Sequence, residues 1–268
     1  MKRFKTYKRK SNKKFYLIIK ILTFSFFIFK IDKLLLNDKF INLINDYYFN
    51  KIEAKEELVS LNIVDEKKPI IYIYNTHQKE EYIGGVLDDY DVMPSVFLAS
   101  KRLKENLMKL GIETIIEETN MEEELYNRGL NFNYSYRLSK ELLLNKINEY
   151  PSLEYFIDLH RDAIPYDRSV ITYLDKDYAK VLFVIGIDLP TYQDNAALAK
   201  TISDKLNQYV PGISRGIMYK NHGNGDYNLD VSSNALLIEL GGEYNKFSEV
   251  NNTLGILASC YMEVINGK

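Results

Sequence analysis

Short apolar runs alternate with amphipathic segments from about residue 67 to the C-terminus. Apolar runs bounded by polar residues, glycine or proline predict strands at 70–74, 112–118, 154–160, 169–174, 178–186, 215–220 and 234–242. Apolar residues three and four positions apart predict helices at 94–110, 134–150, 195–210 and 247–265. Strand–helix–strand units of this length predict an α/β fold whose sheet is mostly parallel and is flanked by helices on both faces.

The segments at 169–174 and 178–186 are joined by a short polar turn around Asp175–Asp177. Two strands joined by a tight turn pair as an antiparallel hairpin. We therefore expect this hairpin to add an antiparallel edge to the sheet, which makes the sheet mixed.

The N-terminal part of the chain differs in composition from the rest. Residues 1–14 carry eight Lys or Arg and no acid, and the remaining residues sum to −10, because the whole chain carries −2. Residues 15–31 are apolar apart from Lys20, Lys30 and two hydroxyl residues. A membrane-spanning helix needs about 17–25 such residues, so we expect a transmembrane anchor here.

The basic tail before the anchor predicts a single-pass protein with a cytoplasmic N-terminus and its globular domain on the outer side of the cell membrane. A cleaved signal peptide is the alternative, but the small-residue cleavage site that it requires does not follow. We expect no nucleic-acid partner, because the basic residues at 1–14 are followed directly by an apolar segment of the membrane-spanning type. Residues 32–66 are predicted to form a membrane-proximal helical stalk, with a partner-binding helix as the alternative, and residues 67–268 the globular domain.

Several predicted strands end in residues that a buried strand does not need. These residues are His77 and Glu80, His160 and Arg161, and Glu239. In an open α/β sheet, ligands bind at the carboxyl ends of the strands, so we expect these side chains to share one edge.

Each of these residues alone has an ordinary explanation as a structural histidine, a helix cap or a salt-bridge partner. Together, His77, Glu80 and His160 provide two imidazoles and one carboxylate, a set that binds zinc and leaves a fourth position for water. Zinc lowers the pKa of bound water to about 7, and a further carboxylate must then carry the proton. Glu239 is the candidate for that acid/base role.

Neighbouring residues have less specific signals. Arg161 could stabilise an oxyanion, bind a substrate carboxylate, or pair with Asp162 to orient the loop. Asp158 precedes His160 by two positions, shares its face of the strand, and could orient that imidazole. His222 lies in a Gly/Asn-rich loop, either at the mouth of the site or without a catalytic duty.

Several segments together resemble the stage II sporulation protein P family of endospore-forming bacteria. In chain order they are YIYNTHQKEEY, YNRGLNFNYSYRLS, FIDLHRD, VLFVIG and YNLDVSSNALLIELGG, from about residue 70 to residue 245. The combination of THxxE, DLHRD and LIExGG is what makes the resemblance specific. The family belongs to the zinc-dependent N-acetylmuramoyl-L-alanine amidases, whose fold is a mixed sheet flanked by helices.

The resemblance implies a membrane-bound enzyme that trims peptidoglycan during engulfment, with Zn²⁺ as its cofactor. It implies sporulation proteins D and M as partners, and an additional endopeptidase activity on peptide cross-links. By motif, it implies His77 and His160 as zinc ligands and Glu239 as the catalytic acid/base.

The third zinc ligand is open between several carboxylates. Glu80 is the matching glutamate of the THxxE element. Glu81, next to it, is an alternative. In related amidases the ligand glutamate lies further from the first histidine, at a distance where this chain has Asp88, Asp89 and Asp91. Asn75 stands where family members often have a second histidine, and that position is therefore not an obligate ligand.

Two other functions fit the same residues. A metallocarboxypeptidase-type hydrolase also uses an H-x-x-E pair with a distant histidine, and Arg161 would then bind a terminal carboxylate. A non-enzymatic scaffold would bind peptidoglycan through a site that does no chemistry.

Overall fold

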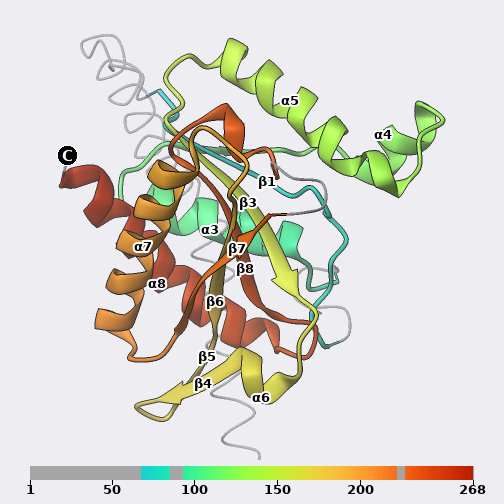
Figure 1. Cartoon of the computed structure of the whole chain (residues 1–268). Helices are drawn as coiled ribbons and strands as arrows, with labels where there is room; N and C mark the ends of the chain where they lie inside the picture. The colour runs from blue at the N-terminus through green and yellow to red at the C-terminus, as the bar shows by residue number, and fades with distance from the viewer. Residues whose placement is uncertain (1–67, 85–92, 222–226, 268) are drawn as a thin grey trace, which may run out of the picture. The chain divides into compact units, whose positions relative to one another are not determined.

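A six-stranded sheet forms the centre of the computed structural model, which describes residues 68–84, 93–221 and 227–267 (Figure 1). Its strands are β1 (Ile71–Tyr74), β2 (Thr114–Ile116), β3 (Tyr155–Asp162), β6 (Val181–Gly186), β7 (Ser214–Lys220) and β8 (Ala235–Gly242). They lie in the order β2-β1-β3-β8-β6-β7. Only the β8–β6 pair is antiparallel among these strands, which confirms the predicted mixed, mostly parallel sheet.

The antiparallel part of this sheet is not the hairpin predicted at 169–186, and that prediction was wrong in placement. The strands β4 (Val170–Tyr173) and β5 (Lys176–Ala179) do pair as a hairpin, but they form a separate two-stranded sheet. The main sheet instead takes in β6, between β8 and β7. All of β6 is buried, whereas β4 and β5 are largely exposed or half-buried. A strand that is apolar on both faces needs an interior position, and a half-polar hairpin does not.

The four helices predicted between residues 94 and 265 are present. The helices of the described residues are α3 (Val96–Lys109), α4 (Met121–Asn127), α5 (Ser135–Glu149), α6 (Tyr166–Ser169), α7 (Tyr192–Tyr209) and α8 (Phe247–Asn266), with two 3₁₀ turns, η1 (Phe132–Tyr134) and η2 (Leu229–Val231). Ser95 caps α3 by accepting a hydrogen bond from the N–H of Leu98. Gly111 follows α3 with a φ of 80°, the left-handed conformation that ends helices. Neither α4 nor α6 was predicted.

Helices cover both faces of the sheet, as predicted (Figure 1). On one face α8 packs between α3 and α7, and Tyr261 of α8 meets Tyr155 of β3 edge-to-face at 6.2 Å. On the other face Ser139 of α5 bonds Thr76, which in turn bonds the side chain of Asp158. Alternate side chains of β3 therefore lie on opposite faces of the sheet, and Asp158 lies on the face that α5 covers.

A small hydrophobic cluster holds α4 against the start of α5, apart from the main core. It consists of Met121, Leu125 and Leu138, with Leu130 and Leu142 packed against them. This separation means that α4 is fixed by local contacts rather than by the sheet.

The predicted tail, anchor and stalk at 1–66 lie outside the described residues. Within the ranges that the structure describes, no helix is both long and apolar enough to cross a membrane.

Candidate functional site

The carboxyl ends of β1, β3 and β8 lie side by side at one edge of the sheet. Tyr74 is in register with Asp158 across β1 and β3, and His160 is in register with Glu239 across β3 and β8. The parallel pairing therefore brings together strand ends that are far apart in the sequence. The strand ends that carry the predicted site residues therefore meet at one edge of the sheet, as expected from the sequence.

His160 lies between two carboxylates. Its Nε2 is 3.0 Å from Oδ1 of Asp158, and its Nδ1 is 3.4 Å from Oε2 of Glu80. The imidazole is almost fully buried, and burial lowers its pKa. The two carboxylates outweigh that effect and raise the pKa of His160 well above its ordinary value of 6.5. The ring thus has a negative charge on each side, and its Nε2 makes no hydrogen bond within the described part of the chain.

A chain of buried hydrogen bonds holds Asp158 in place. Thr76 donates to it twice, from its main-chain N–H at 2.9 Å and from its hydroxyl at 2.6 Å. The Thr76 hydroxyl also lies 2.8 Å from that of Ser139, which accepts from the side-chain amide of Asn228 at 2.8 Å. The network joins β1, β3, α5 and the segment before β8, so it fixes the carboxylate that faces His160. Of its members, the sequence indicated only Asp158.

His77 lies in an aromatic environment. Its ring stacks on Phe132 at 4.4 Å and meets Tyr136 and His160 edge-on at 5.5 and 5.3 Å. Burial and the neighbouring His160 lower its pKa below 6.5, so the ring is neutral at pH 7. Its Nδ1 is buried without a hydrogen-bond partner among the described residues. A neutral imidazole with an unpartnered nitrogen is the form that binds a metal.

Glu239 is the carboxylate whose pKa is shifted towards neutrality. Burial raises the pKa of Glu239 from 4.5 to about 7, and the positive charge of a protonated His160 opposes that rise. Its Oε2 is buried and has no partner in the described part of the chain. A carboxyl group with a pKa near the working pH can both take up and release a proton.

Arg161 is bound to the β1 side of the site. Its main-chain N–H donates to Oε2 of Glu80 at 2.9 Å, and its Nε donates to the carbonyl of Glu81 at 3.0 Å. The alternative ion pair with Asp162 is not formed, because Asp162 pairs with Arg215 at 2.8 Å. Arg161 therefore holds the segment that carries Glu80, and its guanidinium contacts main-chain oxygen.

The candidates for a third ligand are placed differently. Glu80 is half-buried and faces His160, whereas Glu81 is exposed. Asp88, Asp89, Asp91 and His222 lie outside the described residues. Between residues 68 and 267, within the described ranges, no group of three or more His, Cys, Asp or Glu side chains is arranged so that it could hold a metal ion. His77 and Glu80 are the predicted donors that lie beside His160.

Asn75 is buried and structural. Its side-chain amide donates to the carbonyl of Leu159 at 2.6 Å, and its oxygen accepts from Ser100 at 3.1 Å. These two hydrogen bonds link the end of β1 to β3 and α3. They use both the amide nitrogen and the oxygen of Asn75 within the protein.

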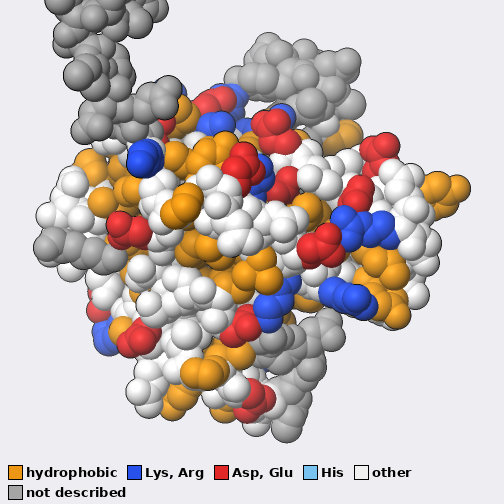
Figure 2. Space-filling view, turned by 90° about the horizontal axis from the view of Figure 1, so that it is seen from above, with side chains coloured by type: hydrophobic (Ala, Val, Ile, Leu, Met, Phe, Trp, Pro, Cys, Tyr) orange, Lys and Arg blue, Asp and Glu red, His pale blue; other side chains and the backbone are white. Residues whose placement is uncertain are grey.

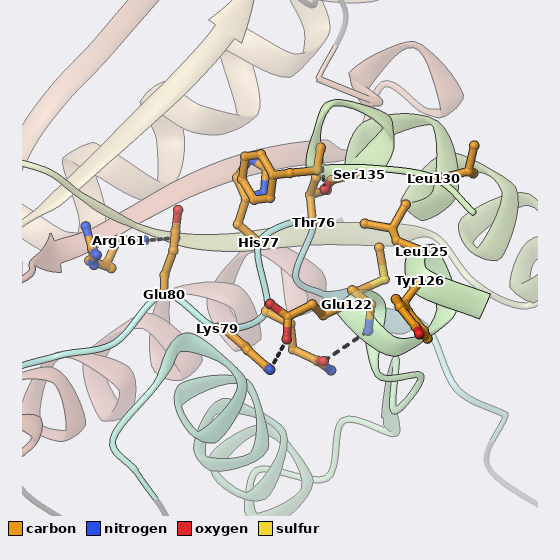
Figure 3. A pocket seen from close by; sticks show the side chains of 13 residues that line it. Thr76, His77, Lys79, Glu80, Glu122, Leu125, Tyr126, Leu130, Ser135 and Arg161 are labelled. Carbon is orange, nitrogen blue, oxygen red and sulfur yellow. Dashed lines mark hydrogen bonds and ion pairs between the residues drawn. The ribbon is translucent and has the colours of Figure 1, made fainter. Parts of the chain in front are cut away.

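A pocket of about 460 Å³ opens directly beside His77 and Glu80 (Figure 3). Its lining comes from the loop after β1 (Thr76, His77, Gln78, Lys79, Glu80), from α4 and the turn that follows (Met121, Glu122, Leu125, Tyr126, Leu130, Phe132, Ser135), and from Arg161. Nothing in the sequence pattern indicated this pocket, because its walls come from three segments that are far apart in the sequence.

The molecule is thus defined as a mixed α/β protein with paired imidazoles and carboxylates at the carboxyl edge of its sheet. The chain belongs to the stage II sporulation protein P family, whose sequence model matches residues 37–261. This confirms the family that the strand-end motifs predicted.

A relative in Bacillus subtilis (strain 168), stage II sporulation protein P, is 28% identical over 205 residues. The match covers 74% of this chain and 51% of that protein, so this chain spans about half of its relative's length.

Solved structures with similar folds include the CwlD amidase from Clostridioides difficile in complex with the GerS lipoprotein. That match is 17% identical, covers 73% of this chain and 99% of the other, and has a TM-score of 0.45. A metallo-carboxypeptidase from Burkholderia cenocepacia matches with 12% identity, over 76% of this chain and 59% of the other, with a TM-score of 0.42.

Proposed function

We propose that this chain is a zinc-dependent peptidoglycan hydrolase that cleaves the amide between N-acetylmuramic acid and L-alanine. The observation that carries the proposal is the convergence of His77, His160 and Glu80 beside Glu239, whose pKa lies at about 7. Membership of a sporulation family supports a role in septal wall remodelling and engulfment.

The chemistry of the donors present suits a zinc ion, and binding would require them to close together from the arrangement seen in the described residues. His77 has a buried nitrogen without a partner, and His160 has Glu80 beside one nitrogen and Asp158 beside the other. Imidazole nitrogen and carboxylate oxygen are the usual zinc ligands, and a ligand histidine with a carboxylate behind it is the usual supporting arrangement. His77, His160 and Glu80 would hold the ion, with Asp158 orienting His160.

When bound, zinc supplies a polarised carbonyl and a water of lowered pKa. The residues of the chain then move the proton. Glu239 accepts it at the buried carboxyl oxygen Oε2 and returns it to the departing amine nitrogen. A carboxyl pKa of about 7 suits both steps, because the group is neither fully ionised nor fully protonated at neutral pH.

Arg161 supports this chemistry from the pocket side. Its main-chain N–H holds the Glu80 carboxylate, which keeps that ligand aimed at His160. Arg161 is among the residues that line the pocket, and we assign its guanidinium to a carbonyl or carboxylate oxygen of the substrate.

The proposal extends to the setting of the enzyme. The apolar segment at 15–31 anchors the chain, with the basic tail in the cytoplasm and the hydrolase on the wall-facing side. The family resemblance adds cleavage of stem-peptide cross-links, and sporulation proteins D and M as partners.

The test uses the full chain, purified in a mild detergent, as wild type and as Glu239→Gln. Each is incubated with purified peptidoglycan, with and without a chelator, and the products are read by mass spectrometry. Intact stem peptides with a free L-alanine amine, absent with chelator and in the variant, are the expected result. Release of single amino acids would instead support a carboxypeptidase, and zinc and wall binding without any product would support a scaffold.

A further inference from the structure

The pocket between the β1 loop and α4 opens onto His77 and Glu80, and apart from these two residues and Arg161 its lining takes no part in the chemistry proposed above (Figure 3). Its volume of about 460 Å³ falls within the ~300–1,000 Å³ of small-molecule sites. A ligand that occupied it would reach the reacting edge of the sheet at one end and α4 at the other.

The walls of the pocket favour an aliphatic ligand. They are built largely from Met121, Leu125, Leu130 and Phe132. Part of the polar lining already has partners inside the protein. The side chain of Gln78 donates to the carbonyl of Thr119 at 3.1 Å and accepts from the N–H of Met121 at 3.3 Å. Against the apolar walls the hydroxyl groups of a sugar would lose their hydrogen bonds to water, so this part of the pocket suits a hydrocarbon chain.

The rim of the pocket carries one charge of each sign. Lys79 and Glu122 form an ion pair there, and their side chains are 64% and 69% exposed. An exposed pair contributes only about 0–1 kcal/mol, so a ligand can separate it at little cost. A ligand end that carries both a carboxylate and an ammonium group matches this pair, carboxylate to Lys79 and ammonium to Glu122.

The exposed side chains that line the pocket are of mixed character. Figure 2 shows acidic and basic side chains interspersed with hydrophobic ones on the face seen from above, rather than a field of one sign. Tyr126, which is 82% exposed and lines the pocket, presents an aromatic surface next to the ion pair. An exposed aromatic ring beside paired charges is a contact surface for a ligand that is part apolar and part charged.

We propose that this pocket binds the stem peptide of the substrate and receives an aliphatic side chain whose end carries an ammonium and a carboxylate group. A diamino dicarboxylic acid residue in the peptide has this chemistry. The proposal rests on the proposed function for the identity of the substrate, and it assigns Lys79, Glu122 and Tyr126 as specificity residues.

The experiment measures peptide binding rather than cleavage. The full chain in detergent is titrated by calorimetry with L-Ala-γ-D-Glu-meso-diaminopimelate. A second peptide ends in L-lysine, which lacks the terminal carboxylate, and a third ends in norleucine, which lacks both groups. All three peptides lack the muramoyl amide, so the proposed reaction cannot consume them.

Four proteins are compared: wild type, Lys79→Met, Glu122→Gln and Tyr126→Ala. Wild type is expected to bind the diaminopimelate peptide about tenfold more tightly than the lysine peptide, the size of one charge-assisted hydrogen bond. Lys79→Met should abolish that preference, Glu122→Gln should weaken both charged peptides, and Tyr126→Ala should weaken all three.

The matched control is Lys200→Met, which breaks the similarly exposed Lys200–Asp204 pair on α7 and should change nothing. Equal affinity of wild type for the three peptides, or a preference that survives Lys79→Met, would overturn the inference. Wall cleavage with no such preference would refute the pocket assignment alone. The expected preference without wall cleavage would support the pocket and refute the hydrolase.

Discussion

Asp158 and His160 stand two residues apart on β3, with Oδ1 of the aspartate 3.0 Å from Nε2 of the histidine. Asp158 is fully buried, and both of its oxygens accept hydrogen bonds from Thr76. The carboxylate is therefore not free to turn away from the imidazole. This arrangement leaves the other nitrogen of His160 as the one that faces Glu80.

We predict that Asp158→Asn lowers the zinc affinity of the chain by about 10–100-fold, the usual effect of losing a carboxylate behind a ligand histidine. The measurement is competition for zinc against a chromogenic chelator. Asp177→Asn, on the exposed hairpin where the carboxylate accepts from Thr172, is the control and should not change affinity. An unchanged affinity for Asp158→Asn in a protein that melts like wild type would show that Asp158 does not orient His160.

Phe132 shields His77 although it is itself 66% exposed. Phe132→Ala should raise the pKa of His77 towards 6.5 in metal-free protein, because burial is the main cause that lowers it. The measurement is the pH titration of the imidazole by NMR. Tyr134→Ala, which removes a half-exposed ring two residues away, serves as the control. If the pKa of His77 is unchanged in Phe132→Ala, Tyr136 and the strand ends alone are enough to bury the ring.

Much of the main sheet could be predicted because its strands are short apolar runs that end at polar residues. The shared edge of His77, His160 and Glu239 followed from the rule that parallel strands present their carboxyl ends together. The place of β6 could not be predicted from its neighbours in sequence. Burial of all six of its residues, not proximity to β5, decides where it pairs.

The supporting parts of the site depend on contacts that sequence patterns do not encode. Thr76 and Ser139 are 63 residues apart and Asn228 is 89 from Ser139, and each is a common polar residue in its own segment. The helix α4 did carry a signal that was missed. Asn120 caps it by accepting from the N–H of Glu123, and acidic residues fill its first turn, a typical helix start.

The backbone of β8 requires a glycine at position 241. Its φ is +69°, and a Cβ there would lie 2.6 Å from Oδ1 of Asn245, the atom that accepts from the N–H of Gly242. We predict that Gly241→Ala destabilises the fold by about 1–3 kcal/mol, from backbone strain and the loss of this bond. Gly255→Ala, in α8 where a Cβ meets nothing within 4 Å, should instead stabilise by about 0.5–1 kcal/mol. Chemical denaturation of the two variants measures both effects. Equal free energies of unfolding for Gly241→Ala and Gly255→Ala would contradict the prediction.

Glu117 links the end of β2 to the core through Tyr72, whose hydroxyl donates to it, and through Thr119, which donates from its N–H and its hydroxyl. Burial raises the pKa of Glu117, but these hydrogen bonds outweigh burial and hold the pKa below its ordinary value of 4.5. Because the folded pKa lies below the unfolded one, the unfolded chain binds more protons in acid. The carboxylate therefore stabilises the fold above pH 4.5, and its contribution is lost as the pH falls through the folded pKa.

We predict that Glu117→Gln lowers the free energy of unfolding by about 1–3 kcal/mol at pH 7, since a buried charged acceptor of several hydrogen bonds is lost. The variant should also flatten the fall in stability below pH 4.5, and urea denaturation across pH 3–7 measures both. Glu105→Gln, in the half-exposed Arg102–Glu105 pair of α3, is the control and should cost no more than about 0.5 kcal/mol. A Glu117→Gln curve that falls in acid as steeply as that of wild type would locate the acid-sensitive group elsewhere.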